Sequence, residues 1–251
     1  MGVWEETALL LVAGFFAGIV NTISGSGTLF SLGALIIMDV PIILANTTTR
    51  PGVFVQNFAG LWSIRRYGGL SLDKVPWDIV IPSTFGALVG AYFAVNVSDQ
   101  LLAIVASLAM ILSMWMILFP RSIPLSTGKN VRLVSYIKYL LFWLVGFYGG
   151  FIQIGVGLLM LAIITNFVTD EYSYANTLKL IIILLYTIPT TIYFIAGDQI
   201  LWKAALLLAA GQFGGAYLAG FFLVVNKNAK VWSKLLTVVF IVITLVEIWF
   251  Y

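Results

Sequence analysis

Long apolar runs follow one another along the whole chain and limit the folds that it can adopt. They cover approximately residues 8–38, 42–64, 77–97, 99–119, 133–168, 172–196, 200–225 and 231–251. A soluble core does not need apolar runs of roughly 18 residues or more, whereas a helix that crosses a bilayer needs about 20. Only 9% of the residues are charged. We therefore expect an all-α polytopic integral membrane protein that forms a single transmembrane domain over residues 1–251.

Two of these runs, 8–38 and 133–168, are too long for one ordinary crossing. Each contains a glycine-rich stretch, "NTISGSGT" at 21–28 and "IQIGVG" at 152–157. Glycine weakens a helix interior and allows tight backbone turns. We predict that each run forms two shorter helical pieces joined at the glycines, either as a re-entrant pair or as a discontinuous spanning helix.

The chain also repeats itself at an offset of about 130 residues. The matched pairs are Gly14 with Gly146, Gly18 with Gly150, Asn21 with Gln153, Gly25 with Gly155, Gly27 with Gly157, and Phe85-Gly86 with Phe213-Gly214. The tripeptide "ANT" occurs at 45–47 and again at 175–177. An ordered series of this kind predicts two homologous halves, about 1–125 and 126–251, each with a glycine-broken first helix and three transmembrane helices.

Loop charge predicts the relative orientation of the halves. If each broken segment returns to its starting side, ten basic residues lie on one side of the membrane: Arg65, Arg66, Lys74, Arg121, Lys129, Arg132, Lys138, Lys227, Lys230 and Lys234. The other side then has only Lys203 in its loops. Single crossings would separate 226–234 from the other basic loops. The positive-inside rule therefore favours returning segments, inverted repeats, a cytoplasmic basic side and two external termini.

Two basic residues lie within apolar runs, and no deep carboxylate accompanies them. Arg50 and Lys179 each follow an "ANT" tripeptide. At helical spacing, Asn46 and Asn57 share a face with Arg50, and Asn176 shares a face with Lys179. An unpaired charge in a bilayer costs at least about 2.5–3.5 kcal/mol. Water in a cavity, backbone carbonyls or a bound anion could compensate it, and snorkelling to the interface is the alternative.

The glycine breaks supply a second part of the expected anion site. A helix that restarts after a break presents unpaired N–H groups and the positive end of its dipole. The expected binding groups are the backbone at Gly25, Gly27, Gly155 and Gly157, the hydroxyls of Ser26 and Thr28, and the amides of Asn21 and Gln153. Close helix packing is the competing role for glycine. We assign it to Gly14, Gly18, Gly86, Gly90, Gly146, Gly150, Gly211 and Gly215.

The order of these motifs resembles the TauE/SafE family, the sulfite exporter family. The resemblance rests on "AGFFAGIVNTISGSGTLFSLGAL", "ANTTTRPGVFVQNFAGLWSIRRYGGL", "GFYGGFIQIGVGLLML" and "GAYLAGFF", and it covers nearly the whole chain. It implies export of sulfite, sulfonates or related sulfur-containing anions across the bacterial inner membrane.

Two function classes stay open on these observations. The first is a secondary anion transporter that works by alternating access, and the second is an anion channel or uniporter on the same scaffold. The chain has no His and no Cys, and it lacks a deep carboxylate pair, so we expect no enzymatic activity, metal or cofactor. The expected partners are a small anion, the lipid bilayer and, through the resemblance, protons. We expect no nucleic acid, and either a monomer or a homodimer.

Overall fold

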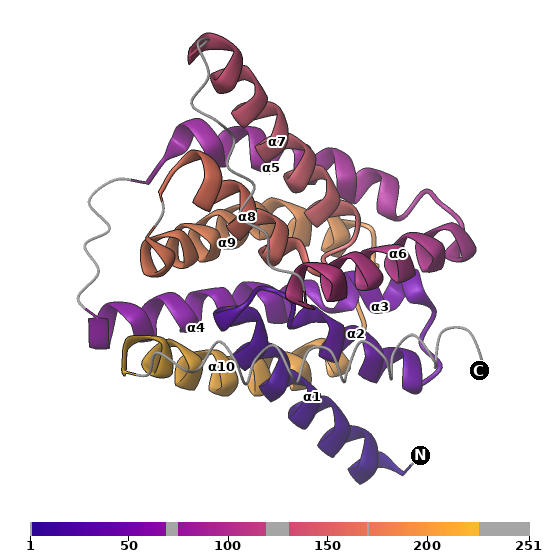
Figure 1. Cartoon of the computed structure of the whole chain (residues 1–251). Helices are drawn as coiled ribbons and strands as arrows, with labels where there is room; N and C mark the ends of the chain where they lie inside the picture. Colours follow the sequence, from indigo (N-terminus) through magenta and orange to yellow (C-terminus); the bar gives the residue numbers. More distant parts are fainter. Residues whose placement is uncertain (1, 69–74, 119–130, 170, 226–251) are drawn as a thin grey trace.

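The computed structural model describes residues 2–68, 75–118, 131–169 and 171–225, and every regular element in these ranges is an α-helix. Figure 1 shows their arrangement. The elements are α1 (Val3–Ile23), α2 (Thr28–Ile37), α3 (Ile42–Thr48), α4 (Arg50–Gly68), α5 (Trp77–Ala94), α6 (Asp99–Leu118), α7 (Val131–Phe151), α8 (Val156–Phe167), α9 (Tyr172–Ala196) and α10 (Trp202–Val225). The expected last span, 231–251, lies outside the described residues.

The distribution of side chains is that of a multi-pass membrane protein. In the described ranges, four helices are long and apolar enough to cross a bilayer: α1, α5, α9 and α10. Large apolar side chains such as Phe58, Ile81 and Leu206 lie exposed on the outside of the bundle. Polar side chains, including Asn46 and Gln56, are buried inside it. An apolar exterior around polar groups suits a lipid environment rather than water.

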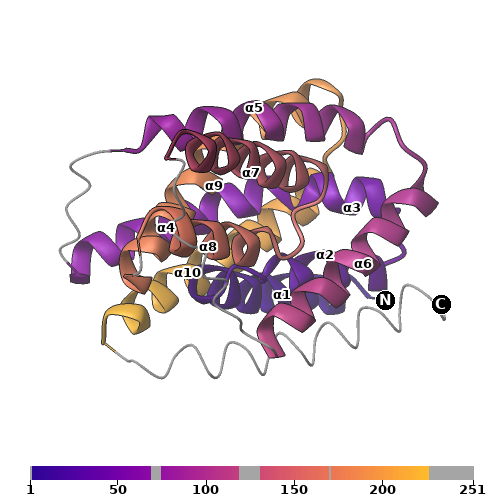
Figure 2. The same cartoon turned by 45° about the horizontal axis from the view of Figure 1, so that its top comes forward.

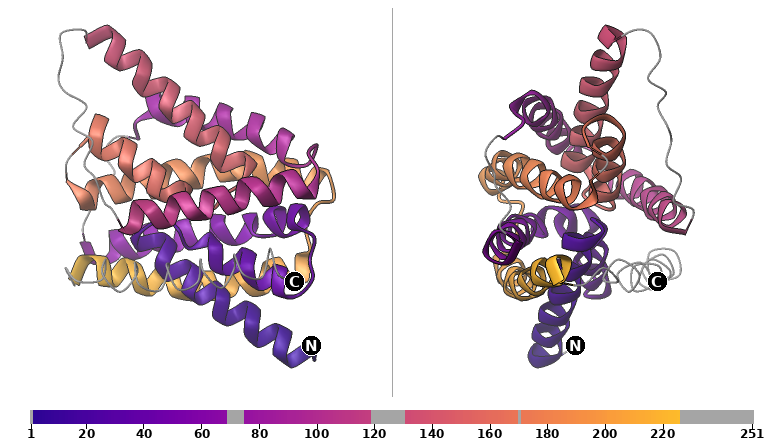
Figure 3. Two further views of the ribbon diagram at one scale, coloured as in Figure 1. Left: turned by 45° about the vertical axis from the view of Figure 1, so that its right-hand side comes forward. Right: turned by 60° about the vertical axis from the view of Figure 1, so that its left-hand side comes forward.

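Two helix pairs occupy the runs that are too long for one crossing. Helix α1 ends at Ile23 and α2 begins at Thr28, while α7 ends at Phe151 and α8 begins at Val156. Gly25, at φ 88°, and Gly155, at φ 67°, lie in the left-handed region that favours glycine. Figure 3 shows that α2 runs back toward the end of the bundle from which α1 enters. The pair α7 and α8 enters and returns at the opposite end.

Each of these pairs packs mainly against a helix from the other half of the sequence: α1 against α10, and α7 against α5. Helices α1, α2, α4 and α10 lie together in the lower part of Figure 1, and α5, α7, α8 and α9 lie together in the upper part. Figure 2 shows α5, α7 and α9 above α1, α2 and α10 from another side. The first half thus contributes α5 to the group of α7, and the second half contributes α10 to the group of α1. Helices α4 and α9 join the two groups.

Glycines permit the closest of these helix contacts. A Cβ added to Gly14 or Gly18 of α1 would lie less than 3.0 Å from backbone oxygens of α10, at Leu208 and Gln212. A Cβ on Gly146 or Gly150 of α7 would meet α5 in the same way, and the facing glycines Gly86, Gly90, Gly211 and Gly215 are equally tight. The packing role expected for these eight glycines is confirmed. Such contacts are typical of helix association in membranes, where small residues let backbones approach.

The run 42–64 differs from the single helix expected there. It divides into α3 and α4 on either side of Thr49. Proline has no N–H, so Pro51 cannot donate to the carbonyl of Thr47 as a helix interior requires. The N–H of Val53 still donates to Thr49 O at 3.0 Å, which keeps the two helices nearly continuous. The interruption places Arg50 at the start of α4.

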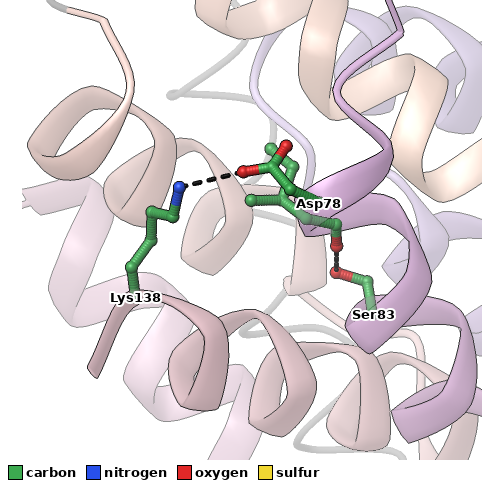
Figure 4. A network of polar contacts seen from close by, with 4 residues as sticks. Asp78, Ser83 and Lys138 are labelled. Atoms are coloured by element: carbon green, nitrogen blue, oxygen red, sulfur yellow. Dashed lines mark hydrogen bonds and ion pairs between the residues drawn. The ribbon is translucent and has the colours of Figure 1, made fainter. Parts of the chain in front are cut away.

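Basic side chains are concentrated at one end of the bundle. Arg65 and Arg66 lie in the last turn of α4. At the same end, Lys138 of α7 forms an ion pair with Asp78 of α5, with Nζ and Oδ2 3.0 Å apart. Figure 4 shows this pair beside Ser83, whose hydroxyl donates to Ile79 O on its own helix. The remaining basic residues expected here, at 74, 121, 129 and 227–234, lie outside the described residues.

Candidate functional site

Arg50 is completely buried and donates to four acceptors around the end of α7. Its Nη1 donates to Gly149 O at 2.5 Å and to Gln153 Oε1 at 3.2 Å. Its Nη2 donates to Gly150 O at 2.9 Å and to Asn46 Oδ1 at 3.2 Å. The last carbonyls of a helix have no intrahelical partner and carry the negative end of the dipole. The guanidinium therefore caps α7.

Lys179 is equally buried and caps α1 in the same manner. Its Nζ donates to Asn21 O at 3.0 Å and to Thr22 O at 3.2 Å. These carbonyls belong to the last turn of α1, which ends at Ile23. The cation of the second half thus stabilises the interrupted helix of the first half, and Arg50 does the reverse.

The two asparagines of the "ANT" tripeptides complete this reciprocal arrangement. Asn46 Nδ2 donates to Phe151 O at 2.9 Å, at the end of α7. Asn176 Nδ2 donates to Thr22 O at 3.0 Å, at the end of α1. Each half therefore uses one cation and one amide to hold the interrupted helix of the other half.

The compensation for the buried charges is visible in these contacts. The sequence left three ways to compensate a buried charge: water in a cavity, backbone carbonyls or a bound anion. In this conformation, backbone carbonyls compensate both charges. The snorkelling alternative is wrong, because both cations are fully buried and bonded to helix ends near the centre of the bundle. Carbonyl dipoles carry only partial charges, however, so each cation keeps a net positive charge that an anion could use.

The two glycine breaks touch each other. The N–H of Gly157 donates to Gly25 O at 3.0 Å. A Cβ on either residue would overlap the backbone of the other, and a Cβ on Gly27 would overlap α1 at Ala17 and Asn21. The backbone at Gly157 was expected to bind the anion, and in this conformation its N–H is occupied by Gly25 O. The glycines act here by allowing the two breaks to cross in direct backbone contact.

The other expected site residues are buried but lie apart from the four acceptors of Arg50. The hydroxyl oxygens of Ser24 and Ser26 are 3.1 Å apart, and Thr28 begins α2. Asn57 donates from Nδ2 to Val53 O on its own helix, at 2.7 Å. Asn21 contributes its backbone oxygen to Lys179. The structure therefore brings together Asn46, Arg50 and Gln153 at one helix end, and Asn21, Asn176 and Lys179 at the other.

Tyr186 is a polar residue of this region that the sequence analysis missed. It is fully buried in α9, and a Cβ added to Gly149 would lie 2.6 Å from its hydroxyl oxygen. Its hydroxyl therefore lies at the end of α7 that Arg50 caps. The available signal was its position two helical turns after Lys179 and about 130 residues after Gln56, another fully buried polar side chain.

A cavity of about 300 Å³ lies near Arg50. Its lining residues come from the end of α5 and from the end of α9 with the turn that follows: Val95, Tyr193, Phe194, Ala196, Gly197 and Gln199. Phe194 has a second contact, because its ring centroid is 5.3 Å from Cζ of Arg50. The ring thus contacts the guanidinium and also lines the cavity. Thr47 and Thr48 of α3 bond to this turn, at Gln199 O and at the N–H of Leu201.

Comparison with known proteins agrees with a transport function for this architecture. The sequence model of the family described as "Sulfite exporter TauE/SafE" matches residues 10–247. A "Probable membrane transporter protein ORF9" of Sinorhizobium sp is 29% identical over 248 residues, which cover 95% of this chain and 90% of the relative. A "Probable membrane transporter protein" of Haemophilus influenzae is 24% identical over 221 residues, covering 84% and 82%. No solved structure matches. The chain belongs to the TauE/SafE sulfite exporter family, a family of membrane transporters.

Proposed function

We propose that the protein is a secondary transporter that exports sulfite, sulfonates or related sulfur-containing anions across the bacterial inner membrane. The observation that carries the proposal is the pair of buried cations at the ends of the two interrupted helices. Arg50 and Lys179 come from corresponding segments of the two halves, and no carboxylate accompanies either among the described residues. Two such cations are costly to keep inside a membrane protein unless an anion uses them.

The anion competes with helix carbonyls for the same cations. In the conformation described, Arg50 Nη1 and Nη2 bind Gly149 O and Gly150 O. A sulfite or sulfonate group carries a full charge and three oxygens, and the planar guanidinium can hold two of them at once. When the anion binds, the guanidinium therefore exchanges the partial charges of two carbonyl oxygens for the full charge of the anion. This exchange releases the end of α7 and couples anion binding to movement of the interrupted helix.

The arrangement of the helices supports alternating access between two inverted repeats, 1–125 and 126–251. The pairs α1–α2 and α7–α8 enter the bundle from opposite ends (Figure 3), as inverted halves require. The two pairs meet at Gly25 and Gly157, so that movement of one affects the other. Discontinuous helices that meet near the middle of the bilayer form the substrate sites of many secondary transporters.

The charge distribution supports an orientation. Arg65, Arg66 and Lys138 lie at the end where α4 finishes and α7 begins, which we assign to the cytoplasm. The start of α1 and the turn between α9 and α10 lie at the opposite, external end (Figure 3). The cavity beside Phe194 is at this external end, so it is the approach to Arg50 from outside.

Flux measurements in proteoliposomes test the proposal. Sulfite, methanesulfonate, sulfate and chloride would be compared with and without a pH gradient, using the parent chain and Arg50→Gln. We expect saturable flux of sulfite or methanesulfonate that Arg50→Gln removes. Arg65→Gln, which removes an exposed charge at the end of α4, is the matched control and should transport like the parent. Flux that rises linearly with concentration would favour a channel, and no flux of any sulfur anion would contradict the proposal.

A further inference from the structure

Three polar atoms near the end of α7 are buried and form no hydrogen bond of normal geometry among the described residues. They are Nε of Arg50, Nε2 of Gln153 and the hydroxyl of Tyr186. All three side chains are at most 1% exposed. A buried polar group without a partner costs about 1–3 kcal/mol, so three of them in one place call for an explanation.

The contacts place these three side chains at the same helix end. Arg50 and Gln153 share a hydrogen bond of 3.2 Å through their other polar atoms. Gly149 accepts from Arg50 and is also the residue whose added Cβ would lie 2.6 Å from the Tyr186 hydroxyl oxygen. Tyr186 also interacts electrostatically with Arg50, and its hydroxyl lies within reach of a side-chain hydrogen bond with Gln153. The three side chains therefore meet at the last turn of α7.

The chemistry of the unpartnered atoms differs between the two helix ends. The Arg50 and Gln153 nitrogens can only donate, and the Tyr186 hydroxyl can donate. Oδ1 of Asn176 and Oγ1 of Thr22, an acceptor and a hydroxyl, are among the unpartnered atoms at the end of α1, beside Lys179. An oxyanion carries only acceptors, so it suits a site lined by donors. The unpartnered donors beside the Arg50 guanidinium therefore suit an anion at the end of α7.

We infer that Tyr186 is a substrate-binding residue, and that its hydroxyl, Arg50 Nε–H and Gln153 Nε2–H together donate to the oxygens of a sulfur oxyanion at the end of α7. This inference rests on the proposed function and locates the anion at the Arg50 end rather than midway between the two cations. These donors come from three different segments of the chain, so each can bond to a different oxygen of a pyramidal or tetrahedral group with three oxygens. Since all three side chains are buried, the anion reaches them when the site opens during alternating access.

Packing alone does not account for the Tyr186 hydroxyl. The Tyr186 ring belongs to a cluster of buried apolar side chains from α4, α5, α7, α8 and α9, where phenylalanine would pack equally well. Tyr148 shows the usual alternative, because its hydroxyl donates to Ile154 O next to the break. A hydroxyl kept in the core without such a partner is a cost to the folded protein that ligand binding can offset.

Tyr186→Phe tests the inference, since it removes only the hydroxyl. Purified full-length protein in detergent would be titrated with sodium sulfite and with methanesulfonate, following affinity by calorimetry and melting temperature by thermal shift. We expect affinity to fall about 10- to 100-fold, as for the loss of a hydrogen bond to a charged group. The ligand-free melting temperature should stay the same or rise, because an unpartnered buried hydroxyl is lost. A structural role for the hydroxyl would instead lower it.

Tyr92→Phe is the matched control, because Tyr92 is exposed on α5. It should leave both the affinity and the melting temperature unchanged. If the parent binds sulfite, Arg50→Gln does not, and Tyr186→Phe binds like the parent, the inference is wrong and the proposed function stands. A lowered ligand-free melting temperature with unchanged affinity would overturn it in the same way. If the parent binds neither anion, the proposed function and the inference both fail.

Discussion

Lys179 of α9 donates from Nζ to the backbone oxygen of Asn21 in α1, at 3.0 Å, and thereby closes the end of a helix from the other half of the chain. Arg50 makes the equivalent contacts with α7. Both contacts join a basic side chain to a helix that stops inside the protein. The basic residues therefore have two roles that mutation can separate, stabilising a helix end and binding the transported anion.

The first prediction separates these roles at Arg50 and Lys179. Arg50→Lys should weaken sulfite binding, because lysine cannot hold two oxygens in a planar fork. Arg50→Gln should nearly remove it, and Lys179→Gln should have a smaller but clear effect. Both glutamine variants should also lower the melting temperature, because each leaves helix carbonyls without a cation. Calorimetry and thermal unfolding in detergent would measure the two effects. Sulfite binding equal to the parent in both glutamine variants would refute the assignment.

The second prediction concerns the crossing of the two breaks. Gly157→Ala should destabilise the protein by about 1–3 kcal/mol and reduce transport, because its Cβ would overlap Gly25. Gly157→Val should abolish transport. Gly214→Ala in α10 is the matched control, since its Cβ would meet only the ring of Phe15 at 3.7 Å. It should preserve stability and flux. A Gly157→Val protein that transports like the parent would show that close contact at the crossing is unnecessary.

The helical class, the spans and the packing glycines could be read from the sequence, because hydrophobic run length and residue size determine them directly. Arg50, Lys179 and their asparagines could also be selected, since charge inside an apolar run is conspicuous. Their actual partners could not be identified. Backbone carbonyls are the same in every residue, so no sequence pattern marks Gly149 or Asn21 as an acceptor.

Tyr186 and Phe194 could not be selected for a similar reason. An aromatic residue in an apolar run is compatible with ordinary packing, and only the three-dimensional arrangement shows that one hydroxyl lacks a partner and that one ring lies on Arg50. The exchange of α5 and α10 between the two helix groups is likewise a tertiary relationship. It pairs α5 with α7 and α10 with α1, and the sequences of these helices do not indicate which helix packs against which.

The third prediction concerns orientation, and it can use single cysteines because the chain has none of its own. Cysteines placed at Arg66 and Lys230 should be labelled from the cytoplasm, and a cysteine at Asp198 should be labelled from outside. The reason is the concentration of basic residues at the end that contains Arg66. A membrane-impermeant thiol reagent applied to intact cells and to inverted vesicles would measure this. Labelling of position 230 from outside would exclude the inverted repeats.

The last prediction concerns Phe194, which contacts Arg50 and lines the external cavity. Phe194→Leu should keep an apolar core while removing a cation–π contact worth about 0.5–2 kcal/mol. Because leucine leaves Arg50 less shielded from the cavity, we expect sulfite to leak down its gradient faster in proteoliposomes. A cysteine placed at Gly197 should also react faster with a charged thiol reagent. Phe93→Leu, a lipid-exposed position on α5, is the control and should change neither rate. An unchanged leak with an intact fold would mean that Phe194 does not separate the cavity from Arg50, and that the external approach to the anion site lies elsewhere.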